Sequence, residues 1–338
     1  MLSRSFNILG TGEYRPEYVV PSHYLDGTLK LPDGSVEKKS GVESRRWAEY
    51  GRETTSFMGA AAARQALEAA GLKPEDVDCV ISAGGTVERA IPCTAVLVQR
   101  ELGLSGSTIP CFDVNSTCLS FLTALDTASA LLEVGRFKRI LIVSSDIPSL
   151  GLDADHLESY SIFGDGAAAA VIGKDSERGS VEVIASHMET YSSAAEVCNV
   201  RAGGTAMHPC REELEYEEFV VASRFSMDGK AAYKVSAEHI EGFVSSLFQG
   251  TDLGIGDMDL VVPHQASMLA MHHLRKKLGI AEDRLVDIFA DHGNQVAASI
   301  PTALHTAITQ GRIKPGNRVL LIGTGAGISI AGMVLSFK

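Results

Sequence analysis

Short apolar segments alternate along the chain with longer amphipathic stretches. In the first half, the apolar segments predict strands at 5–10, 77–82, 111–114 and 139–144. The amphipathic stretches predict helices at 54–70, 91–102 and 119–134. Gly71 and Gly135 stand where the first and last of these helices should end. Strands that alternate with helices predict an α/β fold whose sheet is covered on both faces.

The second half repeats this order. The pattern predicts strands at 260–263, 285–289 and 318–322, helices at 267–278 and 295–310, and a closing antiparallel strand within 327–337. A shift of 176 residues overlays 102–104 on 278–280 and 135–138 on 311–314. The same shift places Cys118 on Asn294. We infer an ancient duplication whose matching loops now carry different polar groups.

The duplication divides the chain into two packed halves, 1–173 and 174–338. The join at 174–179 is short and polar, and no Pro/Ser-rich linker separates the halves. The segment 188–226 fits the repeat poorly, and we expect it to form a loop or lid over the site. The acidic run at 212–218 within it is more typical of a solvated helix face.

Composition narrows the class of protein. The 338 residues are 45% hydrophobic and carry a net charge of −12, which argues against a nucleic-acid surface. No apolar run is long enough for a membrane span or a secretory signal, so we expect a soluble cytoplasmic protein. The six cysteines and the histidines show no metal-binding spacing, and reduced thiols and no metal are expected.

Cys118 stands between a predicted strand and a predicted helix. A thiol at a helix N-terminus faces unpaired N–H groups and the positive end of the helix dipole. That setting favours the thiolate, and the same N–H groups can bind an oxyanion. Taken alone, the residue fits a buried structural cysteine equally well.

His264 and Asn294 also lie between a predicted strand and the following helix. Ligands of open α/β sheets collect at the carboxyl ends of strands, where Cys118, His264 and Asn294 all fall. Either residue alone is more typical of a cap or turn. The three together favour a catalytic site. A papain-type protease is excluded by context, because Asn294 lies in a repeat of the cysteine's own unit and no protease-like motif precedes Cys118.

Several motifs in this order carry a family resemblance. They are Phe112-Asp113-Val114 with Cys118, Phe163-Gly164-Asp165-Gly166-Ala167, Val262-Pro263-His264-Gln265-Ala266, His292-Gly293-Asn294 and Gly311-Arg312-Ile313-Lys314-Pro315-Gly316. With them the chain resembles the 3-oxoacyl-acyl-carrier-protein synthase III family. The resemblance implies the thiolase-like fold, in which two duplicated halves form a five-layer αβαβα sandwich. It also implies a homodimer that needs no cofactor beyond its thioester substrates.

The resemblance further implies a decarboxylative condensation. Cys118 would take an acyl group from a coenzyme A or carrier-protein thioester, and His264 and Asn294 would stabilise the enolate formed when malonyl-carrier protein loses CO₂. The N–H groups of Cys118 and Ala326 would hold the acyl oxyanion. Gly325 and Gly327 flank Ala326, and Ile91 stands where members that use short primers carry a pocket-shaping Phe. Lys234, Lys276 and Lys277 match the region that docks the acidic acyl-carrier protein.

Three departures qualify these expectations. Ser35 and Leu157 replace the Trp and Arg that sandwich the adenine of coenzyme A in the best-known members. We therefore expect this chain not to bind coenzyme A in that way. Leu269 replaces an arginine used in carrier docking.

The alternative function is an acyltransferase of secondary metabolism, with the same three residues, that passes the acyl group to another acceptor. An inert partner subunit, which would lack the active cysteine, is disfavoured by Cys118.

Overall fold

The computed structural model describes residues 4–175, 179–210 and 214–338. Within them, nine strands form one continuous sheet in the order β11-β12-β13-β8-β1-β7-β6-β4-β5. In chain order these strands are β1 (Arg4–Tyr14), β4 (Cys79–Ser82), β5 (Cys111–Asp113), β6 (Arg139–Asp146), β7 (Gly166–Gly173), β8 (Val181–Thr190), β11 (Leu260–Pro263), β12 (Arg318–Gly325) and β13 (Ser329–Phe337).

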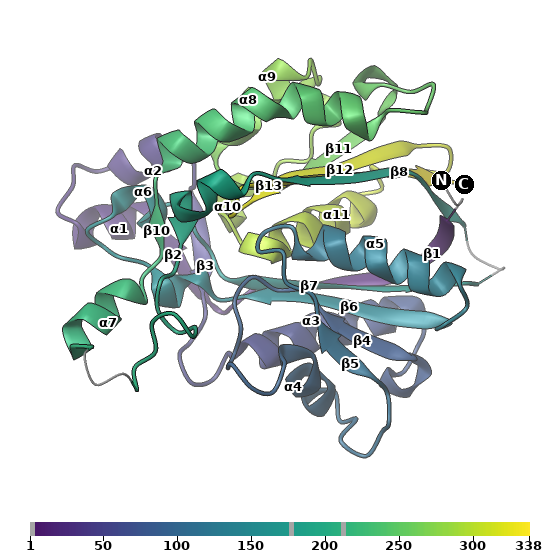
Figure 1. The fold of residues 1–338 in the computed structure, drawn as a ribbon, viewed down its shortest axis with the longest axis horizontal. Helices are drawn as coiled ribbons and strands as arrows, with labels where there is room; N and C mark the ends of the chain where they lie inside the picture. The colour runs from purple at the N-terminus through teal and green to yellow at the C-terminus, as the bar shows by residue number, and fades with distance from the viewer. Residues whose placement is uncertain (1–3, 176–178, 211–213) are drawn as a thin grey trace.

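The sheet is folded into two stacked parts that share β1. Arg4 to Phe6 of β1 pair with β8, and Asn7 to Tyr14 pair with β7. Figure 1 shows α5 (Ser120–Glu133) and α11 (Ser299–Thr309) between the two parts. It also shows α8 (Gly229–Leu247) and α9 (Met268–Lys277) covering one outer face, and α3 (Thr55–Ala70) and α4 (Thr94–Glu101) covering the other. The predicted five-layer αβαβα arrangement is therefore confirmed.

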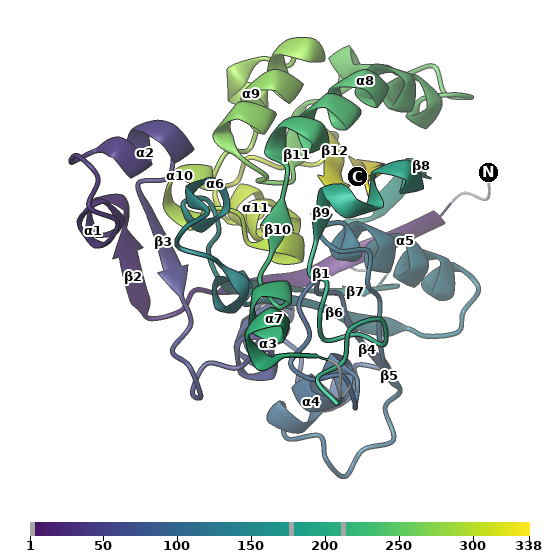
Figure 2. The same cartoon turned by 60° about the vertical axis from the view of Figure 1, so that its left-hand side comes forward.

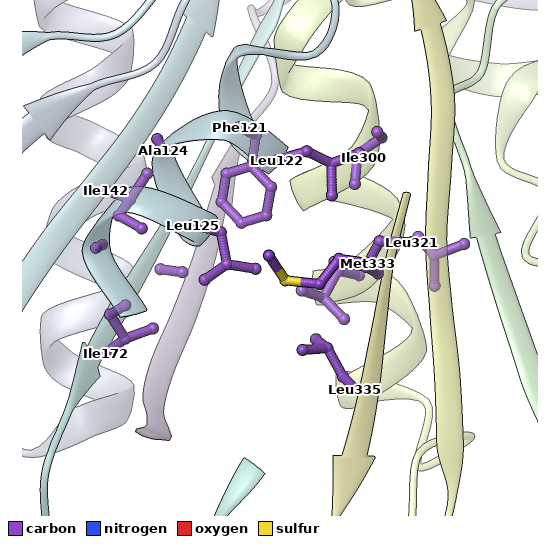
Figure 3. Close-up of a cluster of buried hydrophobic side chains, with 14 of the residues drawn as sticks. Phe121, Leu122, Ala124, Leu125, Ile142, Ile172, Ile300, Leu321, Met333 and Leu335 are labelled. Carbon is purple, nitrogen blue, oxygen red and sulfur yellow. The ribbon is translucent and has the colours of Figure 1, made fainter. Parts of the chain in front are cut away.

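The central layer holds the largest apolar core. Phe121, Leu122 and Leu125 of α5 point toward Met333 and Leu335 of β13, as Figure 3 shows. All five side chains are at most 3% exposed. Burial of a large apolar side chain contributes about 1.5–3 kcal/mol, so this layer fastens the two halves to each other.

The two halves share one connectivity. In the first, β4 and β6 are parallel and β6 and β7 are antiparallel. In the second, β11 and β12 are parallel and β12 and β13 are antiparallel. This agreement supports the predicted duplication. The division at 173/174 stays a prediction, because β7 ends at Gly173, β8 begins at Val181, and residues 176–178 of the join lie outside the described residues.

One predicted strand is wrong. Residues 285–289 make only an isolated bridge between Leu285 and Val261, and a short helix, α10 (Phe289–His292), follows. The side chain of Gln265 explains the difference. Its Nε2 donates to the Val286 carbonyl at 3.1 Å and its Oε1 accepts from the Ile288 N–H at 3.0 Å. A side-chain amide thus replaces the hydrogen bonds of a neighbouring strand.

Two helices begin later than predicted. Instead of starting at Ile91, α4 starts at Thr94, where the Asp113 carboxylate accepts from the N–H groups of Thr94 and Ala95 at 2.8 Å each. These bonds satisfy two of the N–H groups that a helix start leaves free. Likewise α11 starts at Ser299, after a 3-10 turn at Val296–Ala298.

The remaining elements lie at one end of the molecule or in short connections. The strands are β2 (Tyr18–Pro21), β3 (Ser44–Trp47), β9 (Cys198–Asn199) and β10 (Ser226–Met227), and the helices are α1 (Ser22–Thr28), α2 (Ser35–Ser40), α6 (Leu157–Tyr160) and α7 (Tyr216–Ala222). Further 3-10 turns are Pro74–Asp76, Pro148–Gly151, Ser192–Val197, Ile255–Asp257 and Glu282–Arg284.

Residues 188–210 and 214–226, the described part of the predicted loop or lid, contain regular elements. They include the end of β8, a 3-10 turn, β9, α7 and the first residue of β10, and β9 pairs antiparallel with β10 (Figure 2). Of the acidic run, Glu215, Glu217 and Glu218 are exposed, as expected for a solvated face. Residues 212 and 213 of that run, like residues 1–3, lie outside the described residues.

Candidate active site

A cavity of about 800 Å³ opens at the carboxyl ends of the central parallel strands. Its lining includes Pro263 and His264 at the end of β11, Gly323 to Gly325 at the end of β12, and Ile147 directly after β6. Cys118 and Asn294 line the same cavity. The structure therefore brings together the three residues that the sequence singles out, at the sheet edge where the fold predicts a ligand.

Cys118 lies in a tight turn between β5 and α5. Thr117 before it has a φ of +52°, a left-handed conformation that is uncommon for a side chain with a branched β-carbon. The Asn115 side chain stabilises this turn by accepting from the Thr117 N–H at 2.9 Å. The thiol faces the cavity two residues before the first residue of α5.

Burial raises the pKa of Cys118 to about 12, and the nearby Asp146 carboxylate and Cys198 act in the same direction. The backbone N–H groups of Ala326 and Cys118 favour the thiolate, but their effect on the pKa is smaller. This is opposite to the low pKa that the helix start predicts. Desolvation of the charged form outweighs the helix terminus here.

His264 is 5% exposed and directly follows β11. Its backbone N–H donates to the Ile322 carbonyl at 2.8 Å, which extends the β11–β12 pairing into the site. Burial lowers the pKa of the imidazole to about 4, so the ring is neutral at neutral pH. Its Nδ1 is buried without a hydrogen-bond partner among the described residues. A neutral ring has one N–H donor to offer a ligand.

Asn294 is held at both ends of its amide. Its Nδ2 donates to the Ala266 carbonyl at 3.1 Å, and its Oδ1 accepts from the Val296 N–H at 2.9 Å. A side-chain amide has two N–H groups, so one remains for a ligand. The bond to Ala266 also ties Asn294 to the loop that follows His264.

Two glycines let these loops approach closely. A Cβ at position 323 would lie 2.7 Å from the His264 Cβ and 3.1 Å from the Leu119 Cδ2. A Cβ at position 325 would lie 2.7 Å from the Thr117 Oγ1. The bare backbone at the end of β12 thus fits between the cysteine loop and the histidine.

Only some of the other predicted site residues line the cavity. Gly325 and Ala326 line the cavity, whereas Gly327 and Ile91 are absent from its lining. Ile91 is 86% exposed, so within one chain it does not shape the acyl pocket as predicted. The reason is its place at the tip of the exposed segment that precedes α4.

The three predicted docking lysines also lie outside the cavity lining. Lys234 and Lys276 are exposed, and the Lys277 Nζ pairs with the Glu241 carboxylate at 3.4 Å. Lys39 of α2, which the sequence did not indicate, reaches the cavity lining. The apolar Met268 and Leu269 lie there too, with exposed fractions of 47% and 65%.

Sequence reasoning also missed Asp146, Cys198 and Phe225. Cys198 and Phe225 line the cavity from the segment 188–226, whose pattern predicted no element. Asp146 is fully buried at the carboxyl end of β6. Its signal was available, because a carboxylate that directly follows an apolar strand is a candidate for the site edge of an α/β sheet.

Comparisons with known proteins identify the family of this chain. The sequence models of 3-oxoacyl-[acyl-carrier-protein] synthase III and of its C-terminal region match residues 112–192 and 248–337. The enzyme called beta-ketoacyl-[acyl-carrier-protein] synthase III from Clostridium acetobutylicum is 30% identical over 98% of this chain and 99% of its own. The one from Brucella melitensis is 33% identical over 95% and 96%.

This chain belongs to the 3-oxoacyl-acyl-carrier-protein synthase III family. It is therefore a condensing enzyme of the acyltransferase type. The crystal structure of the synthase III from Pseudomonas aeruginosa superposes with a TM-score of 0.86 at 28% identity, covering 99% of each chain. The OleA structure from Xanthomonas campestris, with a TM-score of 0.85 and 21% identity, shares the fold.

Across residues 4–175, 179–210 and 214–338, no group of three or more His, Cys, Asp or Glu side chains is arranged to hold a metal ion. Among the helices of those same ranges, none is long and apolar enough to cross a membrane.

Proposed function

We propose that this synthase III homologue condenses an acyl thioester primer with malonyl-acyl-carrier protein, through an acyl group on Cys118, to give a 3-oxoacyl-carrier protein. The observation that carries the proposal is the convergence of Cys118, His264 and Asn294 on one cavity. The family membership supports the same chemistry, since the relatives are named for it.

The first half-reaction forms a new thioester. The Cys118 sulfur attacks the primer carbonyl, the C–S bond to the carrier breaks, and the departing thiolate takes the proton that Cys118 loses. Because burial raises the pKa of Cys118 to about 12, we expect deprotonation to accompany the attack rather than precede it. The N–H groups of Ala326 and Cys118, which favour negative charge at this point, hold the oxyanion.

The second half-reaction forms the carbon–carbon bond. Malonyl thioester loses CO₂, and the electron pair of the broken C–C bond moves into an enolate. The enolate carbon attacks the acyl group on Cys118, the C–S bond to Cys118 breaks, and the released thiolate takes a proton from solvent. The enolate oxygen accepts hydrogen bonds from the neutral His264 ring and from the free amide N–H of Asn294. These donors are already fixed before the reaction, by the β11–β12 pairing and by the Ala266 carbonyl. Fixed donors stabilise developing charge without reorganisation.

We also propose a homodimer. Val87, Ile91 and Val96 leave apolar side chains exposed on the segment that begins beside the cavity at Thr86. A second copy of the chain would cover this apolar surface and could bring its Ile91 to the primer pocket. The six cysteines are free, which suits a cytoplasmic enzyme.

The test uses the full-length protein with acyl thioesters of graded length, on coenzyme A and on carrier protein, together with malonyl-carrier protein. Mass spectrometry of the protein should show an acyl group on Cys118, and the headspace should show CO₂ release. Light scattering on the same sample should give about twice the 35.9 kDa chain mass. Cys118→Ser should lose the acyl group, while the exposed Cys210→Ser serves as the matched thiol control.

Measuring the two half-reactions separately distinguishes the role of Cys118 from those of His264 and Asn294. His264→Ala and Asn294→Ala should each keep acylation of Cys118 and slow CO₂ release by roughly 100-fold or more. Turnover that survives Cys118→Ser would refute the proposal. Acyl transfer without CO₂ release would instead favour the acyltransferase that uses another acceptor.

A further inference from the structure

Asp146 occupies an unusual position between the two halves of the site. It is the last residue of β6 and is fully buried. No ion pair of Asp146 occurs within residues 4–175, 179–210 and 214–338. A buried carboxylate without a cation is costly unless hydrogen bonds satisfy its oxygens. Both oxygens of Asp146 accept such bonds.

One oxygen of Asp146 binds the loop that follows β4. Its Oδ1 accepts from the Gly85 N–H at 2.8 Å, the Thr86 N–H at 2.6 Å and the Thr86 hydroxyl at 3.0 Å. Gly85 and Thr86 line the cavity. This loop also contacts the cysteine turn, because the Ser120 hydroxyl donates to the Gly84 carbonyl at 3.2 Å.

The other oxygen binds the loop that carries Asn294. The Oδ2 accepts from the Ala297 N–H at 3.1 Å. Ala297 lies three residues after Asn294, in the 3-10 turn whose first N–H, that of Val296, fixes the Asn294 amide. The two loops also touch directly, since a Cβ at Gly85 would lie 2.6 Å from the Val296 Cγ1.

We propose that Asp146 is a positioning residue for the condensation: its carboxylate fixes the Asn294 loop of the second half against the cavity loop beside Cys118 in the first. This inference deepens the proposed function and rests on it. Asp146 touches no reacting atom in this role. It sets the place of the amide that receives the enolate, and its negative charge opposes ionisation of the Cys118 thiol.

The substitution Asp146→Asn tests the two contacts separately. The amide oxygen must face Gly85 and Thr86, because three donors converge there. The amide NH₂ then faces the Ala297 N–H, and two donors oppose each other. The variant therefore keeps the contact with the first loop, releases the Asn294 loop and removes the charge.

The expected result is a pair of opposite changes. CO₂ release from malonyl-carrier protein should fall roughly 10- to 100-fold, as expected for a displaced catalytic group. Alkylation of Cys118 by iodoacetamide at pH 8, followed by peptide mass spectrometry, should become several-fold faster, because the charge that disfavours the thiolate is gone. A variant that merely loosened the fold would slow turnover and expose several cysteines together.

Two further variants serve as controls. Asp113→Asn also removes a carboxylate that accepts two backbone N–H groups, at the start of α4, and should leave the alkylation rate of Cys118 unchanged. Asp146→Glu keeps the charge but displaces the oxygens, so it should slow CO₂ release without speeding alkylation. It also serves if Asp146→Asn does not fold.

Wild-type CO₂ release in Asp146→Asn, or an equal loss of acylation and CO₂ release, would overturn the inference. Failure of the proposed function looks different, because the wild-type enzyme itself would then release no CO₂. The alkylation measurement needs no substrate and stays informative in either case.

Discussion

At the scale of single residues, burial decides the ionisation states in the site. The sequence placed Cys118 beside a helix start and so predicted an acidic thiol. The structure shows that the sulfur is closely surrounded by protein and lies near the Asp146 carboxylate, and the pKa of Cys118 rises to about 12. Helix position can be predicted from local pattern. The burial of the sulfur, like its nearness to Asp146 and Ala326, depends on parts of the chain that only the fold brings close.

The same burial predicts an acid-sensitive fold at His264. The pKa of His264 falls from 6.5 to about 4 on folding. Between these pH values, His264 is therefore protonated in the unfolded chain and neutral in the native protein. The free energy of unfolding should therefore decrease as the pH falls from 6.5 to 4, by at most about 3 kcal/mol from this residue.

Urea unfolding of His264→Asn and of the wild type at several pH values measures this contribution. The stability of the wild type relative to the variant should shrink as the pH falls through this window. The exposed His208→Asn is the matched control. A difference in stability between wild type and His264→Asn that stays constant from pH 7 to 4.5 would contradict the assignment.

At the scale of elements, the end of β12 shows how a strand positions two loops. Gly323→Ala would place a methyl group 2.7 Å from the His264 Cβ and 3.1 Å from Leu119. Both neighbours are nearly fully buried, so the strand or the loops must shift. We expect a loss of about 1–3 kcal/mol in the free energy of unfolding and a clear loss of CO₂ release.

Gly242→Ala provides the control for this prediction. Gly242 lies within α8, and a Cβ there meets nothing within 4 Å. Alanine has the higher helix propensity, so this variant should be neutral or more stable by up to about 1 kcal/mol, with full activity. Urea unfolding and CO₂ release measure both variants, and wild-type behaviour of Gly323→Ala would show that the site tolerates a wider gap.

Elements also mark where sequence patterns succeed and fail. The strand at 260–263 and the glycine ends of α3 and α5 follow directly from local signals, and the structure confirms them. The segment 285–289 has the same apolar pattern as a strand but pairs with the Gln265 side chain. The apolar pattern indicates which side chains are buried. It does not show whether the backbone of the segment forms hydrogen bonds with a neighbouring strand or with a side-chain amide.

At the scale of the whole molecule, the duplication made the candidate site predictable. Cys118 and Asn294 fall at matching points of the two halves, and the structure places both in one cavity. The sequence predicted that residues 188–226 lie over the site, but not the strands β9 and β10 or the residues that line the cavity, because the segment fits the repeat poorly. The place of Asp146 at the site edge had a local signal, but its role did not, since its contacts join residues 60 and 151 positions away in the chain.

The net negative charge of the molecule and its exposed lysines act in opposite directions on an acidic carrier protein. The chain carries a net charge of −12, which repels an acidic carrier protein at long range. Lys234 and Lys276 are exposed on α8 and α9, and the apolar Met268 and Leu269 at the start of α9 belong to the cavity lining. If these lysines dock the carrier, attraction at short range must exceed the repulsion, and added salt should lower kcat/KM for malonyl-carrier protein.

The paired substitution Lys234→Glu and Lys276→Glu tests whether the local charge of these lysines or the net charge of the chain governs carrier binding. We expect kcat/KM for malonyl-carrier protein to fall roughly tenfold at low salt, with little change in acylation from a small thioester, because reversal of rim charges acts mainly on encounter. Near 1 M salt, where screening acts over about 3 Å, the difference between variant and wild type should largely vanish. Lys138→Glu, exposed at the amino end of β6 and thus at the opposite edge of the sheet, is the control. A wild-type rate that rises with salt, or an equal loss in Lys138→Glu, would mean that net charge governs the encounter and that the carrier docks elsewhere.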